Sequence, residues 1–409
     1  MTQNMVRRIV EPDPGHTGVG TQTLLPRRLV RARERAYVSD DNNHLDVTTR
    51  VWPVISDEEI SRVLARLATP LAGTALQVSN RPTTAGILVD AGDTTVFIKR
   101  YGPGAVPPDH LRAVHGLVAH VRAKGFPTPA FLPFADGDTV WETPTGTWEV
   151  CEGAIGEDRY RDDPTWTIPG TLEEAHALGA MTARLALASA DYRARNNPPC
   201  AYQSRMRLFA DDPRRELARW IEQRPGVAAF LRDTGRRIED QWEPHLKFAA
   251  AYAPIARDLP TSWTHGDLHI SNVFWQGLAP SQFIDFGLAD LNPSIYDLAL
   301  VIERNAFEWT RIVDGEEEAV HRDITLALIE GYEDVRPLSP LERRGLIALM
   351  PLIQAESGLN WIDYQYGATR SIPGATWCLD IFFGEHTRWF TRPAGQDYLA
   401  WLDDAVMHE

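Results

Sequence analysis

The spacing of apolar and polar residues changes along the chain from helical to alternating. Residues 56–71, SDEEISRVLARLATPL, carry apolar residues at helical spacing, and Ser56 with Glu59 matches the capping-box pattern of a helix start. The next runs, TALQVS, AGILVDAG and TTVFIKRY, are rich in apolar and β-branched residues and are separated by turn residues. This pattern predicts a globular domain that opens with a helix and continues as an antiparallel β-meander.

A second helical pattern follows the meander. It runs from about Pro108 to Lys124 and ends at Gly125, a residue typical of helix ends. Two further strand-like runs, DTVWET and TWEVCEG, lie on either side of a turn at residues 144–146. Residues 55–152 are therefore predicted to form a small lobe with a five-strand antiparallel sheet and helices.

Strand-like patterns become scarce after Glu152. Helical spacing predicts helices at residues 171–190, 212–224, 226–250, 295–311, 319–332 and 340–365. Residues 153–409 are therefore expected to form a second, mostly helical lobe, so that the chain has a two-lobed α+β fold.

Residues 1–54 differ from both lobes and are interpreted as an N-terminal extension. They contain EPDPGHTGVG, a basic run between Arg27 and Arg35, and the polar stretch SDDNNHLD. A segment of this kind is either a poorly ordered tail or an arm that contacts a protein or peptide partner. The pattern leaves both readings open.

The overall composition is that of an ordinary globular chain. The 409 residues are 44% hydrophobic and 24% charged, and 41 Lys and Arg against 56 Asp and Glu give a net charge of −15. Because nucleic-acid binding relies on clustered Lys and Arg, this balance argues against a nucleic-acid partner. A small cationic partner fits the acidic balance better.

Cysteine usage and apolar runs bear on the compartment. The three cysteines, Cys151, Cys200 and Cys378, lie far apart, which argues against a disulfide framework or a zinc site. The first residues reach Pro and charged side chains before the apolar part of a signal peptide could form, and no run approaches the roughly 18 apolar residues of a spanning helix. We therefore expect a cytoplasmic protein that does not engage a membrane.

The strongest chemical signal lies between Trp263 and Asp297. This segment reads WTHGDLHISNVFWQGLAPSQFIDFGLADLNPSIYD and contains Asp267, Asn272 and Asp285. In phosphoryl transfer, an aspartate orients or deprotonates the attacking hydroxyl, and an amide oxygen with a second carboxylate holds Mg²⁺ across the nucleotide phosphates. His-Gly-Asp or Asp-Phe-Gly alone could be a chance loop sequence, but together, downstream of a β-rich lobe with a lysine in VFIK, they favour such a site.

These motifs resemble those of the aminoglycoside phosphotransferase and choline kinase-like superfamily. The family pattern is HGDxxxxN, then IDFG or IDWE, then a YDLA-type helix start, and this sequence has HGDLHISN, IDFG and YDLA. The resemblance covers about residues 56–390 and is strongest over residues 263–301. It implies a protein-kinase-like fold, with a nucleotide-binding first lobe over residues 55–152 and a catalytic, acceptor-binding lobe over residues 153–409.

The resemblance also implies roles for the matched residues. Asp267 is implied as the catalytic base or hydroxyl-positioning group, and Asn272 and Asp285 as the Mg²⁺ ligands. Lys99, in TTVFIKRY, matches the lysine that contacts the phosphates of ATP or GTP; the alternative is a surface lysine on a strand.

Two further motif residues are expected to be structural. His265 is expected to shape the catalytic loop rather than to act as an acid or base. Asp297 is expected to brace that loop by accepting backbone hydrogen bonds, or to cap its own helix.

The remaining nucleotide contacts are assigned to a turn and a hinge. The turn SNRPTTAG, with Ser79, is expected to cradle the phosphates in place of a glycine-rich loop. The hinge is expected near residues 148–153, where Val150 and Cys151 would lie beside the adenine, Cys151 as a small apolar wall.

The helix after Lys99 departs from the family pattern. Kinases of this kind pair the strand lysine with a glutamate on this helix, but DHLRAVHGLVAHVRAKGFPTP contains none, and the matching position falls at about Val114. Asp109 is one substitute, or Lys99 is held in another way. The departure also leaves a nucleotide-binding pseudokinase open, against which the intact base and metal residues argue.

A polar stripe in the second lobe is the candidate acceptor site. Glu356, Asn360 and Asp363 share one face of an otherwise apolar helix. The stripe either faces solvent or lines the acceptor site and offers carboxylates to amines. The aromatic-rich tail that follows is expected to be mainly core, with a stacking wall for a sugar or nucleobase as the alternative.

The sequence thus predicts a Mg²⁺-dependent O-phosphotransferase. It would transfer the γ-phosphate of ATP or GTP to a hydroxyl of a small polar, amine-bearing molecule, either aminoglycoside-like or an amino alcohol, in a setting of antibiotic resistance or biosynthesis. The alternatives are a Ser/Thr kinase that acts on a peptide within a modifying complex, with residues 1–54 as the partner-binding arm, and a pseudokinase.

Overall fold

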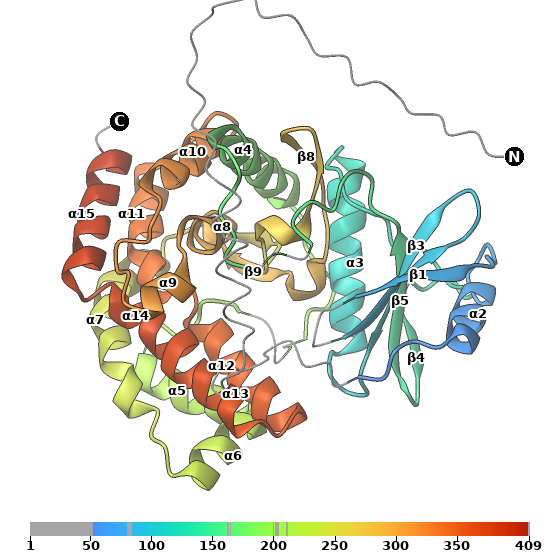
Figure 1. The fold of residues 1–409 in the computed structure, drawn as a ribbon, viewed down its shortest axis with the longest axis horizontal. Helices are drawn as coiled ribbons and strands as arrows, with labels where there is room; N and C mark the ends of the chain where they lie inside the picture. Colours follow the sequence, from blue (N-terminus) through green and yellow to red (C-terminus); the bar gives the residue numbers. More distant parts are fainter. Residues whose placement is uncertain are drawn as a thin grey trace, which may run out of the picture.

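The computed structural model describes residues 52–79, 84–161, 163, 165–198, 200, 204–209 and 212–407. Most of the predicted extension, residues 1–51, lies outside the described residues. The alternatives of a tail and a partner-binding arm therefore both stay predictions. Figure 1 shows a β-rich lobe beside a larger helical lobe, as the sequence predicts. Among the described helices, none combines the length and apolar character that a membrane crossing requires.

The first lobe is built on a five-stranded antiparallel sheet with the order β1-β2-β3-β5-β4. Its strands are β1 (Thr74–Val78), β2 (Ala85–Asp90), β3 (Thr95–Tyr101), β4 (Trp141–Thr143) and β5 (Gly146–Glu152). The alternation of apolar side chains in β3 and β5 splits the sheet into an apolar face and a face that carries Lys99 and Glu149.

A helix covers each face of this sheet. Helix α2 (Asp57–Ala65) packs Ile60 and Val63 onto the apolar face, and the Ser56 and Glu59 capping box is present at its start. Helix α3 (Pro108–Ala123) lies on the other face, between the sheet and the helical lobe (Figure 1). Because the apolar side of α3 belongs to the core cluster of the second lobe, α3 links the two lobes.

The helices of the second lobe enclose a small β-region that carries the catalytic motifs. These helices are α4 (Leu172–Ser189), α5 (Pro213–Glu222), α6 (Pro225–Thr234), α7 (Glu239–Ala256), α8 (Tyr296–Ala306), α9 (Trp309–Val313), α10 (Arg322–Glu333), α11 (Pro340–Leu349), α12 (Ala355–Asp363), α13 (Ile372–Trp377), α14 (His386–Trp389) and α15 (Pro393–Met407). The strands are β6 (Thr261–Thr264), β7 (Val273–Gln276), β8 (Ala279–Phe283) and β9 (Asp290–Pro293), paired as β6 with β9 and β7 with β8.

The predicted helices are present, but three of them are divided. The predicted helix 226–250 splits into α6 and α7 because Gly235 takes a left-handed conformation, φ 67°, and ends α6. The prediction for residues 295–311 covers α8 and α9, and that for residues 340–365 covers α11 and α12 with a 3₁₀ turn around Pro351. Helical spacing runs through these breaks and therefore does not reveal them.

Helices α4 and α10 cross at two glycines. A Cβ on Gly179 would overlap the backbone of Leu328, and a Cβ on Gly331 would overlap the backbone of His176. This close backbone approach holds α4 against α10, near the β6 strand that leads into the catalytic loop.

Gly179→Ala is expected to destabilise the protein. Glycine to alanine in an open helix usually stabilises by about 0.5–1 kcal/mol, but here the methyl group must push two backbones apart. We expect a loss of about 1–3 kcal/mol in the free energy of unfolding, measured by chemical denaturation. Gly367→Ala is the control, because a Cβ there meets only an ordinary contact at 3.5 Å. A gain in stability for Gly179→Ala would contradict the crossing geometry.

Candidate active site

The catalytic motifs lie on two loops that hold each other. The loop after β6 carries Asp267 and Asn272, and the loop after β8 carries Asp285. The Asn272 side-chain amide donates to the Asp267 carbonyl oxygen at 2.8 Å, and the Ile284 N–H donates to the Asn272 carbonyl at 3.0 Å. The chain thereby brings the three predicted residues into one region at the end of the β7–β8 hairpin.

Asp297 braces the backbone of the catalytic loop through its side chain. Its carboxylate accepts the backbone N–H of His265 at 2.7 Å and that of Gly266 at 3.1 Å. Burial raises the pKa of Asp297 to about 6, although both backbone hydrogen bonds pull it down. Although Asp297 lies in the first turn of α8, the hydrogen bonds at its carboxylate hold the loop that presents Asp267.

His265 ties the two loops together. Its Nε2 lies 2.8 Å from the Ile284 carbonyl oxygen, and its ring packs against Phe286 at 4.4 Å between centroids. Burial lowers the pKa of His265 to about 4, so the imidazole is neutral at neutral pH and Nε2 donates to the carbonyl. These contacts give His265 a structural position.

An ion pair connects the two lobes at the site. Lys99 on β3 donates through Nζ to Asp285 Oδ1 at 2.7 Å, with the lysine side chain only 11% exposed. Burial alone would lower the pKa of Lys99, but the nearby carboxylates, Asp285 first, hold its pKa well above the ordinary value. Lys99 is therefore a permanently charged group in the site, not a surface lysine.

Asp285 reaches Lys99 from an unusual backbone conformation. It has φ 61° and ψ 59°, in the left-handed region that few residues other than glycine adopt. Residues held in such conformations concentrate at functional sites, where the surrounding structure fixes them.

The donor atoms at the site fit a divalent cation. Asp285 offers a carboxylate and Asn272 an amide oxygen, both hard donors of the kind that Mg²⁺ prefers. The hydrogen bond from the Asn272 amide nitrogen to Asp267 fixes the amide plane. Among the described residues, no group of three or more His, Cys, Asp or Glu side chains forms a separate metal site.

The predicted hinge lies partly inside the sheet. Strand β5 continues to Glu152, and the Val150 carbonyl accepts the Leu132 N–H at 2.8 Å, so Val150 is a core strand residue rather than a hinge contact. Cys151 lies opposite Phe97, and burial raises the pKa of its thiol to about 12, which agrees with an apolar wall. The connection between the lobes starts at Gly153, one residue after β5.

Ser79 is positioned by the sheet. Its N–H donates to the Gly86 carbonyl at 2.9 Å and extends the pairing of β1 with β2. The turn that follows, residues 80–83, lies outside the described residues. The phosphate-cradling role expected for Ser79 stays a prediction.

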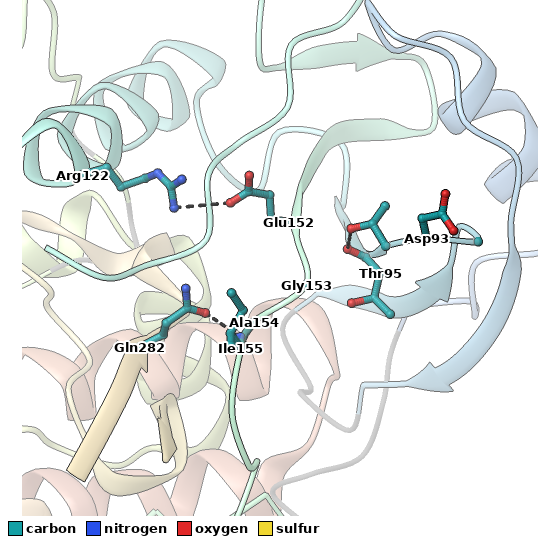
Figure 2. A pocket seen from close by; sticks show the side chains of 10 residues that line it. Asp93, Thr95, Arg122, Glu152, Gly153, Ala154, Ile155 and Gln282 are labelled. Atoms are coloured by element: carbon teal, nitrogen blue, oxygen red, sulfur yellow. Dashed lines mark hydrogen bonds and ion pairs between the residues drawn. The ribbon is translucent and has the colours of Figure 1, made fainter. Parts of the chain in front are cut away.

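A cavity of about 670 Å³ borders the connection between the lobes (Figure 2). Arg122 and Glu152 form an ion pair at 3.3 Å in its lining, and the Gln282 side chain accepts the Ile155 N–H at 2.7 Å. Thr95 and Asp93 lie on the far side of Gly153 in Figure 2. None of the lining residues belongs to the catalytic or metal set, so this cavity lies outside the catalytic constellation.

The polar stripe expected at the acceptor site makes internal contacts instead. The buried Glu356 accepts the backbone N–H groups of Arg205, Met206 and Leu208. Asn360 accepts from Arg224 Nε at 2.7 Å, and Asp363 accepts the N–H groups of Gly226 and Val227 at the start of α6. These contacts explain the stripe without an acceptor and leave the acceptor-binding prediction unsupported, because helical spacing cannot tell a solvent or ligand face from one that holds neighbouring backbone.

Sequence reasoning missed a buried cluster beside Lys99. Glu149 on β5 lies opposite Lys99 in the sheet, and both His115 on α3 and the Tyr101 hydroxyl contact its carboxylate. Asp109, the substitute considered from the sequence, instead bonds Arg112 and Asn196 at the surface. The signal for Glu149 was the alternation of TWEVCEG, but only the strand register places it opposite the lysine.

Comparisons with known proteins identify the family. Residues 84–338 match the model of the phosphotransferase enzyme family. A homoserine kinase from Hyphomonas neptunium is 30% identical over 255 residues, which cover 62% of this chain and 69% of that protein. The chain belongs to this phosphotransferase family, and it is a small-molecule kinase that phosphorylates a hydroxyl group.

Solved structures share the fold. A microcompartment-associated aminopropanol kinase superposes with a TM-score of 0.53 and 18% identity over 83% of this chain and 99% of that chain. An amicoumacin kinase in complex with AMP-PNP, Ca²⁺ and Ami gives a TM-score of 0.50 and 14% identity over 86% of this chain and 94% of that chain. The two-lobed kinase-like fold predicted from the sequence is therefore confirmed.

Asp297→Asn is expected to remove a pH-dependent contribution to stability. A carboxyl whose pKa rises from 3.8 to about 6 on folding stabilises most at low pH, and this contribution is lost as pH rises through about 6. The free energy of unfolding of the parent minus that of Asp297→Asn should therefore fall by about 2 kcal/mol between pH 4 and pH 7, measured by urea denaturation. Asp258→Asn, at an exposed position, should show no such trend. A difference that rises with pH would contradict the assignment.

Glu356→Gln is expected to act on stability rather than on acceptor binding. The amide keeps one acceptor oxygen for three backbone N–H groups, so at least one buried donor loses its partner. We expect a loss of about 1–3 kcal/mol in the free energy of unfolding and little change in the acceptor KM, measured by denaturation and steady-state kinetics. A large rise in KM with unchanged stability would restore the acceptor-binding prediction.

Proposed function

We propose that this protein transfers the γ-phosphate of ATP, with Mg²⁺, to the hydroxyl of a small amino alcohol or hydroxyl-bearing amino acid. The observation that carries the proposal is the Lys99–Asp285 ion pair at 2.7 Å, formed beside the loop that carries Asp267 and Asn272. A charged lysine, a catalytic aspartate and two oxygen donors are the groups that phosphoryl transfer needs.

Each residue has one task in this proposal. Lys99 binds the nucleotide phosphates and offsets their charge. Asp285 and Asn272 would hold the metal ion, which would supply positive charge against the negative charge that develops during transfer. Asp267 accepts the hydrogen bond of the acceptor hydroxyl and takes its proton as the oxygen bonds to the γ-phosphorus, while the bond from that phosphorus to the β-phosphate oxygen breaks and ADP leaves. Most of the rate enhancement then comes from positioning and electrostatic stabilisation.

The acceptor class is supported by the relatives rather than by the site. The homoserine kinase relative and the aminopropanol kinase structure both carry names of small molecules that combine an amine with a hydroxyl. The acidic net charge of −15 agrees with an acceptor that carries an ammonium group. An aminoglycoside acceptor and an antibiotic-related setting have weaker support, because the sequence relative reported above, at 30% identity, is a homoserine kinase.

Asp267→Asn tests the reaction and the acceptor together. A nucleotide-consumption assay with Mg²⁺ would compare homoserine, aminopropanol, an aminoglycoside and a Ser-containing peptide, each with ATP and with GTP. We expect homoserine or aminopropanol to stimulate consumption of ATP, and Asp267→Asn to lower turnover by about 10²–10⁴-fold with nucleotide affinity retained.

Asp258→Asn is the matched control, because this carboxylate is exposed on the same lobe and should leave turnover unchanged. Turnover of Asp267→Asn within a few-fold of the parent would refute the mechanism. Stimulation by the peptide alone would favour the peptide-kinase alternative instead. Nucleotide binding without turnover on any acceptor would favour a pseudokinase.

A further inference from the structure

The carboxylate that faces Lys99 within the first lobe comes from a strand. In the β3–β5 ladder Lys99 and Glu149 are direct cross-strand partners, so their side chains leave the same face of the sheet. Directly opposite residues of an antiparallel pair have Cβ atoms about 4.5–5.5 Å apart. Both residues are at least nine-tenths buried, so their charges interact in a poorly solvated environment.

Helix α3 supplies the group that holds this carboxylate. Val114, at the position expected for a helix glutamate, is buried in the core, and the next residue, His115, faces the sheet. His115 Nε2 lies 2.9 Å from Glu149 Oε2, and its Nδ1 lies 2.7 Å from the Thr139 hydroxyl. The helix therefore contributes the partner of an acidic residue and not the acidic residue itself.

Tyr101 completes the arrangement around Glu149. Its hydroxyl donates to Glu149 Oε1 at 3.1 Å, and the Lys99 ammonium lies 5.2 Å from the centroid of its ring. A Cβ on Gly287 would lie within 3.3 Å of the Tyr101 hydroxyl, Asp285 Oδ1 and Lys99 Nζ, so these three atoms converge on one point. The Glu149 cluster is thus continuous with the ion pair between the lobes.

Lys99 needs a second carboxylate for a physical reason. Asp285 is its hydrogen-bonded partner, but under the proposed function Asp285 also holds the metal ion. A buried ammonium whose counter-charge is shared in this way requires another fixed negative charge to stay charged and oriented. Glu149, the buried cross-strand partner of Lys99 on the same face of the sheet, is a second carboxylate beside it.

We propose that Glu149 is the positioning residue for Lys99 and takes the place of the missing helix glutamate, with His115 and Tyr101 fixing its carboxylate. The proposal rests on the proposed function, since it assigns Lys99 to the nucleotide phosphates. In the expected pattern the carboxylate lies on the helix. Here Glu149 lies on strand β5, and His115, which contacts its carboxylate, lies on α3. The missing glutamate therefore does not indicate a pseudokinase.

The test compares the nucleotide KM of two single variants with that of a double variant in which the carboxylate is moved from β5 to α3. Glu149→Gln removes the negative charge with little change in shape, and it should raise the nucleotide KM at least 10-fold while the acceptor KM changes little. The double variant Glu149→Gln with His115→Glu moves the carboxylate onto α3. It should recover most of the nucleotide KM, whereas His115→Glu alone should be worse than the double variant because it places two carboxylates together.

Two further variants keep the result interpretable. Glu142→Gln removes an exposed carboxylate from the adjacent strand β4 and should leave the nucleotide KM unchanged. Tyr101→Phe deletes one hydrogen bond to Glu149 and should raise the nucleotide KM by a smaller factor, which tests the proposal even where Glu149→Gln fails to fold. Thermal melting of every variant separates loss of structure from loss of positioning.

Lys99→Ala separates this inference from the proposed function. An unchanged nucleotide KM in Lys99→Ala would overturn the proposed function itself. A raised KM in Lys99→Ala, with the parent value kept in Glu149→Gln and Tyr101→Phe, would overturn the role of Glu149 alone. A loss of stability in Glu149→Gln without any rise in nucleotide KM would show a structural brace and would also overturn it.

Discussion

The contact between Lys99 and Asp285 is the interaction on which the site depends. It joins a strand of the first lobe to a loop of the second across 186 residues of sequence, at 2.7 Å. Removing one partner of a largely buried ion pair leaves an uncompensated charge, which costs about 3–5 kcal/mol. The position of one lobe relative to the other at the site therefore depends on this ion pair. The first lobe must hold Lys99, and the second lobe Asp285, within hydrogen-bond distance of each other.

The second lobe presents Asp285 through a layer of structural polar groups. Asp297 holds the backbone of the catalytic loop, and His265 connects that loop to Ile284, the residue before Asp285. Because these groups satisfy the backbone, the side chains of Asp267 and Asp285 are not needed for that purpose. Near neutral pH both groups keep one charge state: burial keeps His265 neutral, and Asp297 is mostly ionised above its pKa of about 6.

Local sequence patterns predicted most of the fold and the residue types of the site. The features that they did not predict depend on contacts between residues far apart in the sequence. The capping box at Ser56 and the alternating strands depend on neighbours in sequence, so they could be recognised directly. The internal partners of Glu356 depend on tertiary contacts, and the left-handed turn at Gly235 that ends α6 is not visible in helical spacing. Helical spacing shows only that residues share a face, and it does not identify what that face contacts.

The partner of Lys99 shows the same limit at the centre of the site. The absence of glutamate from the helix was visible in the sequence, but the one substitute named there, Asp109, lay on the same helix, and no other residue could be named for Lys99. Strand pairing offers a second route, because the register of β3 against β5 fixes Glu149 opposite Lys99 regardless of how α3 moves. A carboxylate built into the sheet is positioned by backbone hydrogen bonds, whereas one on a helix depends on the packing of that helix. The first lobe therefore carries Lys99 and a fixed counter-charge as one unit, and α3 is left to orient the carboxylate through His115 and to connect the sheet to the core of the second lobe.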